Sequence, residues 1–285
     1  MAQERVPCRI GVVVVPARRM NVGALQYLIL AMNKEQSLFQ FEFYNFRSAP
    51  LLLRLLRGHE SVDRAQAEEL MPDFASFASA YIEISNIQIG LVERPPGQFV
   101  VISQCCFSDH YYSTRRDEVS VLALGDWKRT MAPPSFVEFV QALLVREAVG
   151  AMCPSLGGSV HLGTKGCLFD FTEDLTDVRQ KVLLGHVCYH CRTLMTNDGQ
   201  PALADTVISL LNREWLGLSA DPRTPAGVMA SLRYDLFTNK GRKETVREQF
   251  QATLRQEGIK QLATTIVTLV VAAFLFVLGL KTGSR

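Results

Sequence analysis

The first third of the chain alternates between short apolar runs and helical patterns. Residues 10–15 (IGVVVV) form an uninterrupted apolar run, which is typical of a strand buried on both faces. An apolar helix pattern follows at 22–32, and the alternation at 39–46 (FQFEFYNF) predicts a half-buried strand. Residues 50–72 carry leucines at helical spacing. This order of strands and helices predicts a mixed α/β fold.

The middle of the chain continues the pattern. Three further strands are predicted, at residues 81–89, 99–103 and 119–124. The residues RPPG at 94–97 indicate a turn between the first two. After two prolines, Ser135 begins a helix that should run to residue 151, with Glu138 three positions on as the second half of a capping box. The region up to about residue 195 is therefore predicted to have strands first and helices after.

Composition narrows the class of protein. With 48% hydrophobic and 20% charged residues among 285, the chain can fold around a substantial core. A formal net charge of +2 gives no basis for a nucleic-acid partner. The N-terminal stretch lacks the longer apolar region and cleavage site of a signal peptide, so we expect the folded part to stay in the cytoplasm. Seven cysteines, an odd number, fit reduced thiols better than a disulfide framework.

An uncharged segment near the C-terminus changes the expected location. It begins at Leu262 and ends at Leu280, with Lys260 and Lys281 beside it. A helix over it would be roughly 28 Å long, close to the hydrocarbon thickness of a bilayer. A buried core helix is the alternative, but core helices are seldom apolar all round for so many turns. Basic residues are denser upstream, so the positive-inside rule places the N-terminal bulk at the cytoplasmic face of the inner membrane.

The chain is predicted to have three parts. These are a folded domain at 1–198, a helical connector at 199–260 and a transmembrane helix at 261–281. Within the connector, the residues DPRTP at 221–225 interrupt the helical pattern, and a charged helix is expected from 244 to 260.

A cluster of metal-ligand residues stands out in residues 161–191, which hold three of the seven cysteines and three of the five histidines. Cys188 and Cys191 form a C-x-x-C, which can place two thiolates on one metal ion. Redox pairs use the same spacing, but a third cysteine upstream, Cys167, favours a tetrahedral zinc site. Three residues could supply the fourth ligand: His161, His190 and Cys153. Cys105 and Cys106, at a strand end, are expected to be buried thiols.

The pattern H-x5-C-L-F-D-F…D-L-T-D-V…C-x-x-C in residues 161–191 resembles the segment that closes the active site of archaemetzincins. In those small zinc proteases a helix carries HExxHxxGxxH, and four cysteines hold a second zinc ion. The resemblance extends in outline over residues 8–195 and implies a zincin-like fold, an α/β (α+β) mixed sheet with helices. It makes His161 the counterpart of the third catalytic histidine.

The resemblance also implies a structural zinc site. Cys167, Cys188 and Cys191 match three of the four cysteines, while Leu162 stands where the first should be. His161 would complete the set as the fourth ligand of a structural Zn²⁺.

The catalytic motif is degenerate. The best match to HExxH is REAVG at 146–150. Arg146 puts a fixed cation where a neutral ligand belongs, and Gly150 has no side chain to offer. Glu147 would have no metal-bound water to activate, so a helix carboxylate in a salt bridge or in solvent is the expected role. The distance along the chain to His161 is also too long for the family's motif.

A second metal motif is weaker. Residues 59–63 read HESVD on an expected helix, so His59, Glu60 and Asp63 could act as a rearranged catalytic set with His161. A solvated helical face is the simpler interpretation. Asp109, beside a histidine and two tyrosines, is a further polar cluster.

These observations together predict a membrane-anchored, zincin-like pseudoprotease. It would act as a binding or sensor-effector protein at the cytoplasmic face of the membrane. Its partner would be an unknown protein or small molecule, and the chain could form homo-oligomers. Such an effector would fit an anti-phage or stress response in a bacterium. The alternative is an active membrane-tethered zinc metallopeptidase that uses His59, Asp63 and His161.

Overall fold

The computed structural model describes residues 6–15, 22–46, 48–57, 61–125, 127, 131, 133–157, 161–173, 175–234 and 250. The chain divides into two compact units, Met1–Arg242 and Lys243–Arg285. Almost all described residues belong to the first unit.

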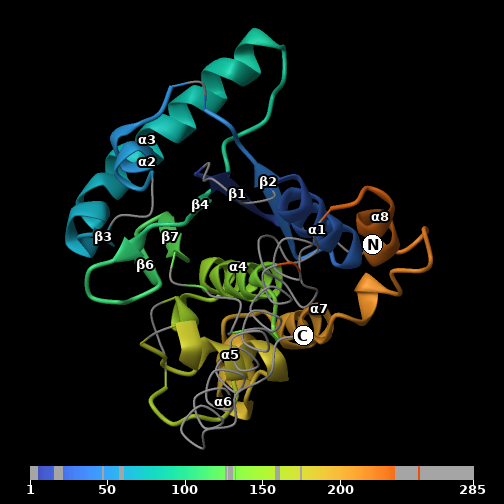
Figure 1. The fold of residues 1–285 in the computed structure, drawn as a ribbon. Helices are drawn as coiled ribbons and strands as arrows, with labels where there is room; N and C mark the ends of the chain where they lie inside the picture. The colour runs from blue at the N-terminus through green and yellow to red at the C-terminus, as the bar shows by residue number, and fades with distance from the viewer. Residues whose placement is uncertain are drawn as a thin grey trace, which may run out of the picture. The chain divides into compact units, whose positions relative to one another are not determined.

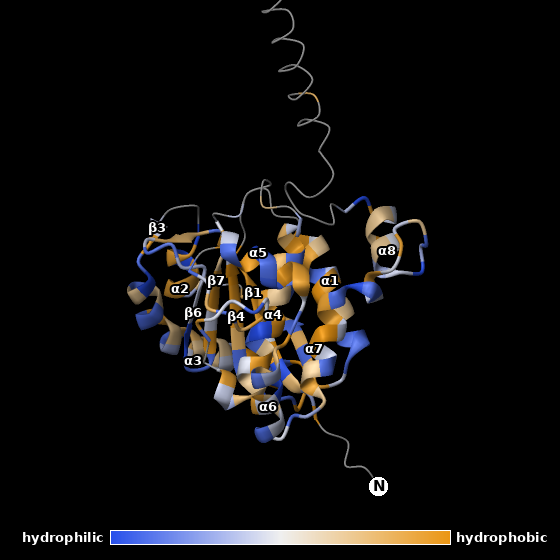
Figure 2. Cartoon of the chain, turned by 90° about the horizontal axis from the view of Figure 1, so that it is seen from below, coloured by the Kyte–Doolittle hydropathy of each residue, from blue (hydrophilic) through white to orange (hydrophobic). Residues whose placement is uncertain are grey.

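The first unit is built on a five-stranded sheet. Its strands are β1 (Cys8–Val14), β2 (Phe39–Phe43), β4 (Gln98–Ser103), β6 (Ser113–Arg116) and β7 (Val119–Ala123). Their order across the sheet is β2-β1-β4-β7-β6, and all neighbouring pairs are parallel except the antiparallel pair β6–β7. The three inner strands are the apolar runs that were predicted as strands from the sequence, and Figure 2 shows their apolar residues between the helices.

Helices cover both faces of this sheet, as Figure 1 shows. On one face lie α1 (Val22–Glu35) and α4 (Phe136–Met152), which form the larger core with strand residues such as Val100 and Ile102. On the other face lies α3 (Arg64–Gln88), which packs against the alternate strand residues. Because successive side chains of a strand point to opposite faces, one apolar run supplies both cores.

The remaining elements are short. They are α2 (Leu51–Leu55), β3 (Ser61–Val62), β5 (Cys106–Phe107), η2 (Pro154–Leu156), α5 (Leu175–Leu184), α6 (Tyr189–Asn197), α7 (Leu203–Asn212), η3 (Glu214–Leu216) and α8 (Pro225–Ser231). β3 and β5 form a separate two-stranded sheet. Val207 of α7 and Met229 of α8 belong to the same core as α4, so helices beyond residue 198 pack on the sheet domain.

Two predictions about residues 50–89 are wrong. The strand expected at 81–89 is part of the helix α3, which continues past Pro72. Its buried residues recur at helical spacing and form one face: Ala67, Met71, Phe74, Ala78 and Ile82. The single helix expected at 50–72 is divided, because α2 ends at Leu55 and the two residues of β3 come before α3.

The predicted capping box at the start of α4 is confirmed. The backbone N–H of Glu138 donates to the Ser135 hydroxyl at 3.2 Å, and the Glu138 carboxylate accepts from the Ser135 N–H at 2.5 Å. The helix that follows is buried on nearly all sides, so its position is fixed by the core and not only by its cap.

Apart from Phe250, the expected charged helix at 244–260 and the membrane segment at 262–280 lie outside the described residues. Within the described ranges, no helix combines the length and the apolar character that a membrane span requires.

Candidate metal site and adjoining cleft

The structure brings together the four side chains that were predicted to bind zinc. His161 and Cys167 come from the loop between α4 and α5. Cys188 is the N-cap residue of α6, and Cys191 lies in the first turn of that helix. The C-x-x-C therefore spans a helix start, which directs both thiols to the same side.

The distances between these ligand atoms match a tetrahedral zinc site. All four atoms lie within 4.8 Å of one another. The sulfurs of Cys167 and Cys191 are 3.9 Å apart, and the Cys188 sulfur is 3.4 Å from His161 Nε2. With Zn–S near 2.3 Å and Zn–N near 2.0 Å, tetrahedral angles require about 3.8 Å between sulfurs and about 3.6 Å between sulfur and nitrogen. The donor set therefore fits Zn²⁺ with little rearrangement.

Asp170 supports this site from behind the histidine. Its buried carboxylate has one oxygen that accepts hydrogen bonds from the N–H groups of Lys165 and Cys167, at 2.9 and 3.0 Å. The other oxygen lies 3.0 Å from His161 Nδ1 and makes no hydrogen bond in the structure, while the Gly163 carbonyl oxygen lies 3.3 Å from the same nitrogen. A metal on Nε2 would leave the proton on Nδ1, with both oxygens within reach as acceptors. Asp170 thus supports the tautomer that leaves Nε2 free for the metal.

The thiol cluster favours a thiolate before any metal binds. The pKa of Cys167 is lowered to about 4, chiefly by its hydrogen bond with Cys191. The Cys188 N–H also donates to the Cys167 sulfur, at 3.3 Å. The same sulfur–sulfur hydrogen bond raises the pKa of Cys191. The lowered pKa favours the thiolate form of Cys167, and metal binding has to release the protons of the thiols that remain protonated.

Of the three candidates for the fourth ligand, the structure places His161 beside the thiols. His190 is exposed, although it is next to a ligand in the sequence. Cys153 is buried at the C-terminal end of α4, and burial raises the pKa of its thiol to about 11. Leu162, where the archaemetzincin pattern has a cysteine, is 84% exposed and contributes nothing to the cluster.

The degenerate catalytic motif forms an ion-pair cluster on α4. The Glu147 side chain is only 7% exposed. Its carboxylate accepts hydrogen bonds from Ser120 Oγ at 2.6 Å and from Arg146 Nη1 at 3.0 Å. A second guanidinium approaches from β6, with Arg115 Nη1 at 3.9 Å from the same carboxylate. The salt-bridged role expected for Glu147 is therefore the one that the structure shows.

Arg115 also lies against Gly150, the last residue of this motif. A Cβ atom on Gly150 would lie 2.5 Å from Arg115 Nη1, so the guanidinium takes the space that a histidine side chain would need. Arg146 supplies the second cation beside Glu147. Since guanidinium groups stay protonated, neither can bind a metal ion.

The second metal motif is not assembled among the described residues. His59 and Glu60 lie outside them. The expectation of one helix over this motif is wrong, because Ser61–Val62 form β3 and Asp63 is the N-cap of α3, accepting from the Ala65 N–H at 2.9 Å. Asp109 accepts from Arg64 Nε at 2.5 Å, so it serves an ion pair. Across the described ranges, the thiol cluster is the group of metal-ligand side chains that converges.

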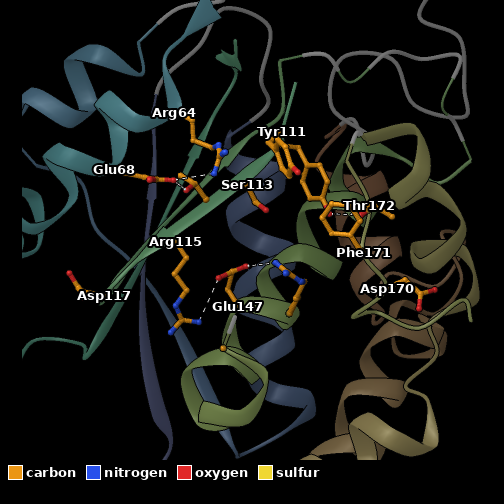
Figure 3. Close-up of a pocket in the computed structure, with 14 residues that line it drawn as sticks. Arg64, Glu68, Tyr111, Ser113, Arg115, Asp117, Glu147, Asp170, Phe171 and Thr172 are labelled. Atoms are coloured by element: carbon orange, nitrogen blue, oxygen red, sulfur yellow. Dashed lines mark hydrogen bonds and ion pairs between the residues drawn. The ribbon is translucent and has the colours of Figure 1, made fainter. Parts of the chain in front are cut away.

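A cleft of about 510 Å³ adjoins both features. In Figure 3, Arg115 and Glu147 lie at its base, and Tyr111, Phe171 and Thr172 lie together on one side. Asp170 also lines this cleft, so the carboxylate behind His161 is a wall that the cleft shares with the thiol cluster.

Sequence reasoning missed Asp170 and Arg115. The letters FDF after Cys167 mark Asp170 as a polar residue between apolar neighbours, which is a signal for a buried partner. Arg115 lies in a charged stretch of surface character, and nothing in the linear sequence connects it to Gly150.

Comparisons with known proteins give distant structural likenesses. No protein-family model matches the chain, and no curated protein is a significant match. It is similar to the crystal structure of archaemetzincin from Methanopyrus kandleri, with 11% identity and a TM-score of 0.45, over 70% of this chain and 99% of that one. It is also similar to a zinc-dependent peptidase from Methanocorpusculum labreanum, with 12% identity and a TM-score of 0.41, over 65% of this chain and 99% of that one. These likenesses are too distant to assign a function, which depends on the residues described above.

Proposed function

We propose that this protein is a zincin-like domain that holds a structural zinc ion and binds a ligand without cutting peptides. The observation that carries the proposal is the Arg115 guanidinium in the space beside Gly150. A zincin of the HExxH type needs two histidines one helical turn apart to hold its catalytic metal. Here one of those positions is Arg146 and the other is filled by Arg115.

The third catalytic histidine of the motif would also be in use elsewhere. His161 turns its Nε2 atom to Cys188 and its Nδ1 atom to Asp170. The Nε2 atom is therefore committed to the thiol cluster, and the Nδ1 atom faces the oxygens of Asp170 and Gly163. This arrangement supports a single metal site, and the bound ion would cross-link the loop after α4 to the start of α6, which would contribute to the stability of that lobe.

Metal content and peptidase assays test the proposal on the full chain, purified in detergent. We expect one zinc ion per chain by mass spectrometry and no cleavage of a fluorogenic peptide library. The competing function, a metallopeptidase that uses His59, Asp63 and His161, requires a second ion and cleaved product. Two zinc ions together with cleavage that a zinc chelator stops would overturn the proposal.

The proposal includes a membrane tether. The uncharged segment from Leu262 to Leu280 is long enough to span a bilayer, and its flanking charges orient the folded domain toward the cytoplasm. We expect the full chain to remain in membranes washed with alkaline carbonate and to dissolve in detergent. A chain that ends at residue 258 serves as the comparison, and recovery of the full chain in the carbonate wash would contradict the tether.

A further inference from the structure

We propose that the cleft between α4 and β6 binds a small ligand through an oxyanion, either a phosphate or a carboxylate, with an apolar ring beside it. This inference rests on the proposed function, because it takes the base of the cleft to be an anion site in place of a metal site. It names the class of ligand that the domain recognises.

The base of the cleft carries an excess of positive charge. Two guanidinium groups, Arg115 and Arg146, face one carboxylate, Glu147, which also accepts from the Ser120 hydroxyl. The base therefore carries one positive charge in excess. An oxyanion that enters the cleft would neutralise it, and guanidinium groups are well matched to phosphate and carboxylate.

Both guanidinium groups at the base keep N–H donors that are not used in hydrogen bonds. Arg146 donates through Nη1 to Glu147, but its Nε is buried and has no hydrogen-bond partner. Arg115 donates through Nη2 to Gln98, and its Nη1 lies 3.9 Å from Glu147, beyond hydrogen-bond distance. Both side chains remain about a fifth exposed, at 21% and 22%. They can therefore reach a ligand without breaking the cluster.

Outside the base, the charges that line the cleft are mainly acidic. Arg64 pairs with two carboxylates, Asp109 and Glu68. The Asp170 carboxylate accepts from two backbone N–H groups and lies beside His161. Asp117 pairs with Arg116 at 4.0 Å and is largely exposed at the rim, where solvent screens its charge. The positive excess is therefore local to the base, where an entering oxyanion would meet two guanidinium groups and one carboxylate.

Aromatic side chains form one wall of the cleft. Tyr111 and Phe171 have ring centroids 6.4 Å apart, and the Tyr112 hydroxyl is hydrogen-bonded to Thr172 at 2.7 Å. Figure 3 shows Tyr111 and Phe171 on one side of the opening, with Arg115 across from them. A cleft of about 510 Å³ that joins rings to a few polar groups suits a small molecule.

Three matched probes test this proposal by calorimetry on the full chain in detergent. Phenyl phosphate and phenylacetate share a ring and differ in the oxyanion, while benzyl alcohol keeps the ring without charge. We expect binding of at least one anionic probe, and the preferred one identifies the oxyanion. Arg115→Gln should weaken that binding at least about tenfold, the usual value of a charge-assisted hydrogen bond. Arg223→Gln removes the same charge from an exposed residue that pairs with Asp221 and does not line the cleft, and should leave affinity unchanged.

A second variant should change the affinity for the anionic probe in the opposite direction. Glu147→Gln removes the competing carboxylate and leaves both guanidinium groups available, so the anionic probe should bind several-fold more tightly. Arg115→Lys, which keeps the charge, serves in place of Arg115→Gln if that variant fails to retain zinc. No binding of either anionic probe, or equal losses in the Arg115 and Arg223 variants, would overturn the proposal, as would weaker binding by the Glu147 variant. Peptide cleavage with intact probe binding would instead count against the proposed function alone.

Discussion

Cys188→Ser should remove the zinc ion and destabilise the lobe formed by α5 and α6 more than any other single change proposed for this protein. The Cys188 sulfur lies 3.4 Å from His161 Nε2, and its backbone N–H supports the Cys167 sulfur. A serine hydroxyl would replace a thiolate ligand, and the ion would lose one corner of its site. When free zinc exceeds its dissociation constant a thousandfold, the lost binding is worth about 4 kcal/mol of unfolding free energy. For a domain of this size, that lowers the Tm by about 10 °C.

Two further variants serve as comparisons for Cys188→Ser. Cys105→Ser makes the same chemical change at a buried thiol outside the cluster, so it should keep the full zinc content. Asp170→Asn should keep the ion but bind it about 10–100-fold less tightly, because it weakens the contact that orients His161. Competition with a zinc chelator measures the zinc content and the zinc affinity of both variants. If Cys188→Ser kept wild-type zinc content and Tm, the structural zinc site would be refuted.

Four strands of the sheet could be predicted because they are specified locally, whereas β6 was not predicted. Residues 10–15 and 119–124 are short apolar runs, and a run that is apolar at every position fits an inner strand between two cores. The start of α4 was equally accessible, because a capping box is a pattern of two residues that bond to each other. The mixed α/β architecture follows from such local signals.

The prediction failed where local preference and tertiary contacts disagree. The residues of 81–89 include four isoleucines, which favour strands in isolation. In the folded chain Ile82 extends the buried face that Ala67, Met71 and Phe74 begin, so packing against the sheet keeps the segment helical. The helix also continues through Pro72, although proline is unfavourable inside a helix.

The candidate site divides in the same way. Cys188 and Cys191 are close in sequence, and their spacing together with Cys167 upstream indicates a shared metal ion. The role of Arg115 depends on β6 lying beside α4, a juxtaposition that no spacing encodes. The absence of ligand side chains at Arg146 and Gly150 could therefore be seen in the sequence, whereas the guanidinium that lies against Gly150 could not.

Glu147→Gln gives the second large effect expected, and its sign distinguishes a structural carboxylate from a catalytic one. Glu147 is the counter-charge for Arg146 and Arg115 and the acceptor for Ser120. Removing one partner of a buried ion pair costs about 3–5 kcal/mol, and partial exposure of both guanidinium groups reduces this to about 2–3 kcal/mol.

That loss would lower the Tm by about 4–10 °C, which thermal unfolding of the full chain in detergent with excess zinc can measure. Glu69→Gln on the exposed face of α3 is the matched control and should change the unfolding free energy by less than about 0.5 kcal/mol. A catalytic glutamate behaves in the opposite way, because active sites hold like charges and unpaired groups at a cost to stability, and neutralising them often stabilises the fold. A rise in Tm for Glu147→Gln would therefore contradict the ion-pair role and return this residue to the list of candidate catalytic groups.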